Sequence, residues 1–433
     1  MSSIVVSGDT SGAVTLDAPT VAGTVTVTLP AASGTMVVTG SSPSLANVTA
    51  TGNLSVSGNT TLGDASTDTV LMTGAPSIGG AGYGMGMGFR NRIINGAMVI
   101  DQRNAGALVS GATGGTYVLD RWKFWANGGG GSYTVQQSTI SPAGFTNSLA
   151  LTQTTSYSPT GSDYSIFAQY IEGYNVSDFG WGASGATAVT LSFWVRSSLT
   201  GTFGGAVSNS SQARSYPFTY TISAANTWEY KTITIPGDTT GTWIKNTGAG
   251  ILLFWQLGVG STYLGTATGA WQAATYLGAT GATQITATNG ATLYITGVQL
   301  EKGSTATSFD HRDYGRELAL CQRYYQSIAG STLSGDQYVM AGHCNTNTQA
   351  RFTYTYVVPM RASPTVTYGT ASNYMVYSGA AAVLGTAVTQ AGAGDFRFLG
   401  TSVTVASGLT AGYGAVLLGL NTTASTIQVS AEL

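Results

Sequence analysis

The sequence predicts an all-β protein: an intertwined trimeric β stem, then a jelly-roll β-sandwich and a smaller C-terminal β-domain, with one short helix between the last two. Three observations carry this prediction. Apolar and small polar residues alternate over short runs along most of the chain, which is the period of β-strands. The chain has 60 Gly among 433 residues and is rich in Ser and Thr, which favours turns. Only the segment near residue 320 has the spacing of an amphipathic helix.

Residues 1–40 alternate in the manner of strands, for example at 25–29 (VTVTL), and Pro30 ends that run. Residues 41–88 contain a six-residue repeat, 51–56 (TGNLSV) followed by 57–62 (SGNTTL). So few repeats cannot enclose a core in one chain, whereas three identical chains around one axis would supply the missing faces. We therefore expect a homotrimer, with a Gly and Met collar at 79–88. A flexible Gly/Ser/Thr linker remains the alternative for this segment.

Residues 89–310 show short strands separated by turn signals, as expected of a sandwich or jelly roll. Examples are 190–195 (TLSFWV), 231–235 (KTITI) and 292–295 (TLYI). In 311–329 we expect one connecting helix between Tyr314 and Tyr325, with Asp313 as its N-cap and with Leu318, Cys321 and Tyr325 on its apolar stripe. Residues 330–433 return to alternation and predict the C-terminal β tip domain.

The composition and charge of the chain exclude several kinds of partner. Charged residues make up 8% of the chain and the net charge is −2, so we exclude nucleic acid and acidic lipid surfaces as partners. The longest apolar run, around 251–255, is too short for membrane insertion. The first residues lack a basic region followed by an apolar core, so we expect no signal peptide and synthesis in the cytoplasm. Cys321 and Cys344, the two cysteines, are expected to be free thiols.

Seven segments, in this order and spacing, resemble a recurrent family of tailed-bacteriophage tail fibres and related virion proteins with a carbohydrate-binding-module-like jelly roll. They are 91–98 (NRIINGAM), 117–122 (YVLDRW), 171–176 (IEGYNV), 191–195 (LSFWV), 235–243 (IPGDTTGTW), 297–303 (GVQLEKG) and 317–325 (ELALCQRYY). The resemblance covers about residues 89–325. It implies a virion protein with an N-terminus attached to the particle, a trimeric axis and a distal recognition region, made in the host cytoplasm.

Glycan-binding modules lay aromatic rings against the apolar faces of pyranoses, so rings that face away from the core are the candidates. The chain has 23 Tyr, 13 Phe and 8 Trp. Alternation in 191–195 puts Trp194 on the face opposite Leu191, Phe193 and Val195. Other candidates lie in or beside turns, where a ring has little local core to enter. The glycan-binding candidates are Tyr174, Trp181, Trp194, Trp243 and Tyr276. Alternatively, these rings cap the sandwich or pack in the trimer interface.

Catalysis is not expected. A depolymerase needs two carboxylates at a defined separation, and Asp163, Glu172 and Asp178 show no such spacing. His311 and His343 lie near no nucleophile elbow and, with the cysteines, match no zinc template, so we expect no catalytic residue, metal or cofactor.

The function we expect is a tail fibre that docks on phage baseplate, tail or neck proteins and binds host surface polysaccharide or lipopolysaccharide, with avidity from three sites. The alternatives are a structural head or baseplate decoration protein and, less favoured, a polysaccharide depolymerase tailspike.

Overall fold

A computed structural model describes residues 89–433 apart from 112–113, 329–336, 380, 393 and 421–424, together with four short strands before residue 89. The chain forms two compact units, residues 1–73 and 74–433. In the first, β1 (Ser3–Ser7) pairs antiparallel with β2 (Ala13–Asp17), and in the second, β3 (Ser77–Ile78) pairs with β4 (Ala81–Gly82). The six-residue repeats lie outside the described residues, so the attachment segment 1–40, the trimeric stem 41–88 and the other domain limits stay predictions.

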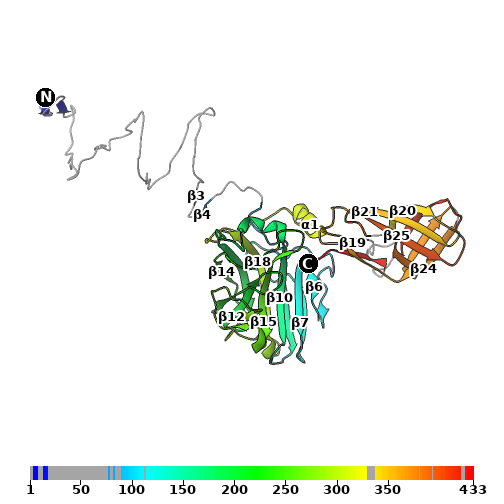
Figure 1. Ribbon diagram of the computed structural model, residues 1–433, viewed down its shortest axis with the longest axis horizontal. Coiled ribbons are helices and arrows are strands. Elements are labelled where there is room, and N and C mark those ends of the chain that lie inside the picture. The colour runs from blue at the N-terminus through cyan, green and yellow to red at the C-terminus, as the bar shows by residue number, and fades with distance from the viewer. Residues whose placement is uncertain are drawn as a thin grey trace. The chain divides into compact units, whose positions relative to one another are not determined.

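Two six-stranded antiparallel sheets pack face to face as a β-sandwich (Figure 1). In spatial order, sheet I contains β13 (Ser215–Ile222), β12 (Gly201–Ser208), β15 (Ala249–Val259), β10 (Tyr164–Glu172), β7 (Trp122–Asn127) and β6 (Thr116–Leu119). Sheet II contains β14 (Glu229–Ile235), β11 (Val189–Ser197), β18 (Thr292–Lys302), β9 (Ser148–Thr155), β8 (Ser132–Ser138) and β5 (Val109–Ser110). The all-β jelly-roll prediction is confirmed for the described part of the chain.

Short elements complete the loops of this sandwich. β16 (Leu264–Gly265) pairs parallel with β17 (Gly278–Ala279). Four single 3₁₀ turns lie between the strands: η1 (Gly173–Asn175), η2 (Ser177–Phe179), η3 (Ser261–Tyr263) and η4 (Ile285–Ala287).

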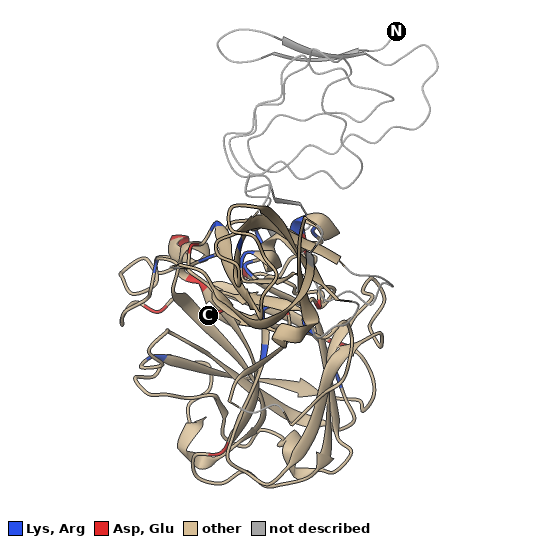
Figure 2. Cartoon of the chain, turned by 90° about the vertical axis from the view of Figure 1, so that its right-hand side faces the viewer, with Lys and Arg blue, Asp and Glu red and all other residues tan. Residues whose placement is uncertain are grey.

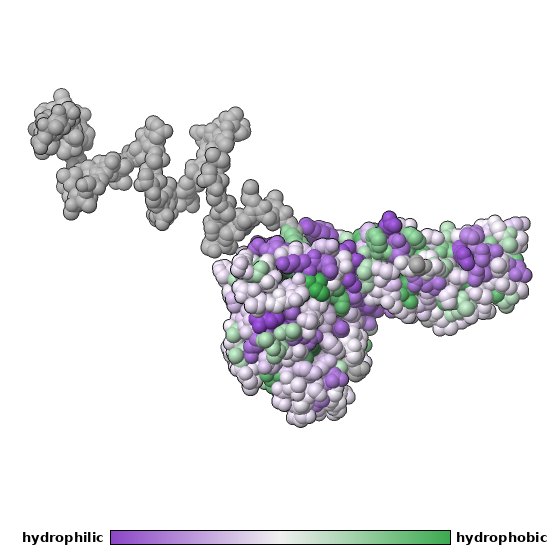
Figure 3. Space-filling model, viewed as in Figure 1, coloured by the Kyte–Doolittle hydropathy of each residue, from purple (hydrophilic) through white to green (hydrophobic). Residues whose placement is uncertain are grey.

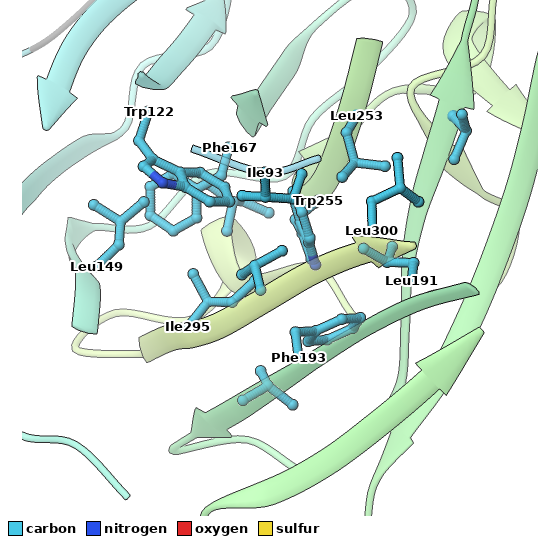
Figure 4. Close-up of a cluster of buried hydrophobic side chains, with 14 of the residues drawn as sticks. Ile93, Trp122, Leu149, Phe167, Leu191, Phe193, Leu253, Trp255, Ile295 and Leu300 are labelled. Carbon is cyan, nitrogen blue, oxygen red and sulfur yellow. The ribbon is translucent and has the colours of Figure 1, made fainter. Parts of the chain in front are cut away.

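The core lies between the two sheets because alternate side chains of each strand point inward. Figure 4 shows Trp122, Phe167 and Trp255 from sheet I facing Phe193 and Ile295 from sheet II. All five side chains are fully buried. The predicted alternation of β11 is confirmed, since its inward residues are buried and Trp194 lies on the other face.

The predicted helix is present as α1 (Tyr314–Gln322). Asp313 caps it, because its carboxylate accepts a hydrogen bond from the backbone N–H of Arg316 at 2.9 Å. Cys321 is buried against Ile94 and Ile100, so the helix packs on the segment that leads into the sandwich. The prediction that Tyr325 lies on the helix stripe is wrong, because the helix ends at Gln322 and Tyr325 begins β19 (Tyr325–Ile328), which pairs with the strand at Ile427–Ser430.

The C-terminal residues form more β-structure, as predicted. β19, β27 (Ile427–Ser430) and β22 (Thr365–Tyr368) form a three-stranded sheet, and the turn η5 (Ala371–Asn373) follows β22. Six strands close a barrel in the order β20 (Gln337–Cys344), β21 (Gln349–Thr355), β25 (Phe398–Val405), β24 (Ala381–Gln390), β23 (Tyr374–Ser378) and β26 (Gly414–Gly419). Phe352, Val376 and Leu417 fill its interior.

Ion pairs connect the sandwich to the last residues of the sequence. Arg121 and Arg103, which follow and precede β6, both pair with Glu432, and Tyr117 donates a hydrogen bond to the carbonyl of Leu433 at 2.6 Å. Figure 2 shows that charged residues are few and that several gather near the C-terminus. Cys321 and Cys344 are free thiols, as predicted, and both are buried. Among the residues that the structure describes, no helix has the length and apolar character of a membrane span.

Candidate functional site

The outer face of sheet I carries a row of partly exposed aromatic side chains. They are Tyr117, Trp125, Tyr164, Tyr170 and Tyr263, and we call them the aromatic face. Four come from β6, β7 and β10, and the fifth comes from η3, which the chain brings back beside β10.

Strand alternation places these rings. In β7 the indole of Trp122 enters the core, whereas Lys123 and Trp125 lie on the outer face. In the neighbouring β10, Ile166 pairs with Trp125 and Ala168 pairs with Lys123. Ile166 and Ala168 are fully buried although they lie on the outer face, because the larger side chains beside them cover them. They form an apolar floor beneath the rings.

The rings of the aromatic face pack edge to face. The ring centroids of Trp125 and Tyr164 lie 5.5 Å apart at 88°, and those of Tyr164 and Tyr263 lie 5.7 Å apart at 81°. Tyr170 contacts Phe254 of β15 in the same way, at 6.4 Å. Aromatic pairs favour this geometry, which holds the rings in fixed orientations.

An ammonium group lies among these rings. Nζ of Lys123 is 4.7 Å from the ring centroid of Trp125, 5.0 Å from that of Tyr170 and 5.7 Å from that of Tyr117. Partial burial lowers the pKa of the Lys123 ammonium, and the charge of Glu432 opposes that shift. The aromatic face therefore combines apolar rings with one strong hydrogen-bond donor.

An open cleft of about 350 Å³ adjoins the aromatic face at Trp125. Its lining residues are Gly114, Trp125, Ala126, Asn127, Gly128, Gly129, Gly131, Tyr133 and Tyr157. Gly129 has a φ of +74°, and a Cβ on it would lie 2.2 Å from the ring of Tyr157. Glycine thus lets the backbone of 128–131 lie against Tyr157, whose hydroxyl is hydrogen-bonded to that of Ser165 at 2.8 Å.

Rings beside a cleft with polar backbone suit an uncharged ligand that has both apolar faces and hydroxyl groups. The rings offer flat apolar surfaces, and the cleft offers backbone groups together with the amide of Asn127. Figure 3 shows a largely pale surface over the described residues, between the hydrophilic and hydrophobic extremes. The surface can therefore make stacking contacts and hydrogen bonds.

Three of the predicted candidates are accessible, but none belongs to the aromatic face. Tyr174 lies on η1 with 60% of its surface exposed. Trp194 lies on the outer face of sheet II, where its ring centroid is 5.4 Å from that of the exposed Tyr230. Tyr276 is partly exposed in the loop before β17, and its backbone N–H donates to the hydroxyl of Ser215. The structure therefore places these three candidates at separate sites.

The expectation that Trp181 and Trp243 have little core to enter is wrong. They are only 3% and 8% exposed, and their ring centroids are 4.7 Å apart in an edge-to-face pair that also packs against Trp271. Their indole N–H groups donate to backbone carbonyls, of Thr187 at 2.8 Å and of Thr240 at 3.1 Å. Loops distant in sequence meet over these rings, so both tryptophans cap the sandwich.

Each of the acidic residues Asp163, Glu172 and Asp178 pairs with another part of the protein. Their partners are Arg323 and Tyr324 for Glu172, Arg92 for Asp178, and the backbone N–H of Thr160 for Asp163. His311 and His343 are exposed. Within the described residues, no three His, Cys, Asp or Glu side chains gather as a metal site would require.

The sequence contains a signal for Trp125. In 122–126 (WKFWA), the alternation that we applied to Trp194 also puts Lys123 and Trp125 on the face opposite Trp122 and Phe124. No such local signal exists for Tyr263, because it lies in a turn and reaches the aromatic face only through the path of the loop.

No protein-family model matches this chain, and no curated protein matches it. The enzymatically active domain of tailspike protein 4 from bacteriophage CBA120 matches 49% of this chain and 21% of its own, with 13% identity and a TM-score of 0.26. A putative sugar-binding protein from Bacteroides thetaiotaomicron matches over 49% and 100%, with 11% identity and a TM-score of 0.29. A family 11 carbohydrate-binding module from Clostridium thermocellum matches over 44% and 91%, with 10% identity and a TM-score of 0.23.

Proposed function

We propose that this chain is the subunit of a homotrimeric bacteriophage tail fibre, which attaches to the virion through its N-terminal segment and binds a host cell-surface glycan. The sequence resemblance over about residues 89–325 supports the virion assignment. The partners of the fibre would be baseplate, tail or neck proteins at the N-terminal end and host polysaccharide or lipopolysaccharide at the other end.

The aromatic face is the observation that carries glycan binding. Trp125 is its central residue, because its ring packs against Tyr164, receives the ammonium of Lys123 and lines the cleft. A pyranose stacked on Trp125 would place its hydroxyl groups beside the backbone of 128–131 and the amide of Asn127. A single stacked ring contributes roughly 1–2 kcal/mol, so strong attachment requires several sites acting together.

Binding of a monovalent host oligosaccharide to the full-length protein tests this assignment without avidity. We expect Trp125→Ala to weaken binding about tenfold or more while the protein stays folded, with an unfolding temperature lowered because the ring no longer covers Ile166. Trp194→Ala is the matched control, because it removes the same side chain from the outer face of sheet II. Loss of binding in the control variant alone would move the site to sheet II, and wild-type affinity in both would refute binding by these rings.

The proposal assigns no catalysis to this chain, and two rival functions have distinct readouts. New reducing ends after incubation with host capsule or lipopolysaccharide would show a depolymerase. A purified protein that adsorbs to no host cell, while its loss disrupts the particle, would indicate a structural decoration protein. Binding should also persist at high salt, because stacking and neutral hydrogen bonds are screened little and only a contact with the Lys123 ammonium would weaken.

A further inference from the structure

The half-buried ammonium of Lys123 has no acceptor in the part of the protein that the structure describes. Its Nζ lies 4.7 Å from the ring centroid of Trp125, 5.0 Å from that of Tyr170 and 5.7 Å from that of Tyr117. None of the described residues accepts a hydrogen bond from Nζ or forms an ion pair with it. Ring faces attract the charge, but they accept N–H groups only weakly. The three N–H donors of Lys123 are therefore available to a ligand.

Gly115 keeps open the position that this ammonium occupies. It directly precedes β6 and has a φ of +90°, and a Cβ on it would lie 2.3 Å from Cε and 2.9 Å from Nζ of Lys123. A side chain at this position would displace the lysine. Gly114, the residue before it, lines the cleft together with Trp125. The ammonium thus borders both the rings and the cleft, within reach of a short substituent on a sugar stacked on Trp125.

An ammonium among rings favours a ligand group that accepts hydrogen bonds without donating any. A hydroxyl group would bring a proton of its own, for which the ring faces offer only a weak acceptor. The carbonyl oxygen of an acetamido group only accepts, and the methyl group beside it can contact the rings. A carboxylate also only accepts. The negative charge of Glu432 already acts on Lys123, which disfavours a second carboxylate beside it.

We infer that the aromatic face selects sugars that carry an N-acetyl group. The pyranose stacks on Trp125, and the acetamido carbonyl oxygen accepts a hydrogen bond from Nζ of Lys123. This selectivity rests on the proposed function, because it names the class of sugar bound at the same site. Lys123 then determines specificity, whereas Trp125 supplies stacking to acetylated and unacetylated sugars alike.

Two matched sugars test this selectivity, because chitotriose carries an acetamido group at each C2 position where cellotriose carries a hydroxyl group. Isothermal titration of the full-length protein should show chitotriose binding at least about tenfold more tightly than cellotriose. Equal affinities for the two sugars, or no binding of chitotriose, would overturn the inference. The comparison uses the unaltered chain, so its outcome does not depend on whether a variant folds.

Removal of the ammonium should abolish the preference. Lys123→Met deletes the three donors and keeps an apolar side chain of similar length, so we expect the affinity for chitotriose to fall to that for cellotriose. The affinity for cellotriose should stay within about twofold, because stacking on Trp125 remains. Lys245→Met is the matched control, since it removes an ammonium from an exposed loop and should change neither affinity. A preference for chitotriose that survives Lys123→Met would contradict the role of this lysine.

Trigalacturonate, a third probe, distinguishes a carboxylate from an acetamido ligand. If it bound more tightly than chitotriose and lost that advantage in Lys123→Met, the ammonium would pair with an acid and the acetamido inference would be wrong. The proposed function is read separately through Trp125→Ala. If that variant loses the host oligosaccharide while the unaltered chain shows no preference for chitotriose, only the inference fails. If that variant keeps full affinity for the host oligosaccharide, the proposed site itself fails.

Discussion

Glu172 and Arg323 form a salt bridge in which Oε1 and Nη2 lie 2.8 Å apart, joining the end of β10 to the residue after α1. The hydroxyl of Tyr324 donates to the other carboxylate oxygen at 2.6 Å. Glu172 is buried, so loss of one of these partners would leave a buried carboxylate less well compensated. This carboxylate therefore attaches α1 to the sandwich.

Replacing this carboxylate should destabilise the protein. We expect Glu172→Gln to lower the free energy of unfolding by about 1–3 kcal/mol, because the amide loses the ion pair and mismatches one donor. Denaturant titration of the full chain measures this change in the free energy of unfolding. Glu229→Gln is the control, since Glu229 pairs with Lys231 near the surface and should cost less than about 1 kcal/mol. Equal losses of unfolding free energy in the two variants would show that Glu172 contributes no more to stability than the surface residue Glu229.

Asp120 should make stability depend on pH. Burial raises the pKa of this carboxyl to about 6, against hydrogen bonds from Gln102 that lower it. The folded chain therefore holds the proton up to a higher pH than the unfolded chain, whose carboxyl has a pKa of about 4. Stability should fall as the pH rises from about 4 to about 6, by up to about 3 kcal/mol. Asp120→Asn should remove that fall, and an unchanged pH profile of the unfolding free energy in this variant would refute it.

The tryptophan pair that caps the sandwich should matter for stability. We expect Trp181→Ala to cost about 3–5 kcal/mol, because it removes a buried ring and leaves the carbonyl of Thr187 without its indole donor. Thermal or chemical unfolding shows the loss. Trp194→Ala, at a partly exposed ring, should cost clearly less. A smaller loss for Trp181→Ala than for Trp194→Ala would contradict the capping role.

The glycine loop beside the cleft should tolerate no side chain at Gly129. Gly129→Ala combines a positive φ with a clash against Tyr157, whereas Gly144→Ala has a similar φ of +87° and open space around it. We expect the first to destabilise by about 1–3 kcal/mol more than the second and to weaken oligosaccharide binding. Unfolding measurements report the loss of stability, and isothermal titration with the oligosaccharide reports the loss of binding. Identical behaviour of both variants would mean that the loop does not lie against Tyr157.

Local patterns predicted the elements well because they depend on neighbouring residues. The strand at 191–195 faces as its alternation requires, and Asp313 caps the helix that follows it. The helix ends before Tyr325 because tertiary pairing with β27 draws that residue into β19. Among the residues of the aromatic face, alternation could have identified Trp125. It could not have ranked Trp125 above Trp194, because both tryptophans follow the same alternation.

The sequence by itself determined the all-β class, the facing of the strand at 191–195 and the low charge of the chain, since a two-residue period and a composition are local properties. Only the tertiary structure decided which outer faces stay open. Trp181 and Trp243 are buried, and Tyr263 joins Tyr164, because loops many residues away fold over those positions. Burial depends on what the rest of the chain places above a side chain, and no neighbouring residue encodes that.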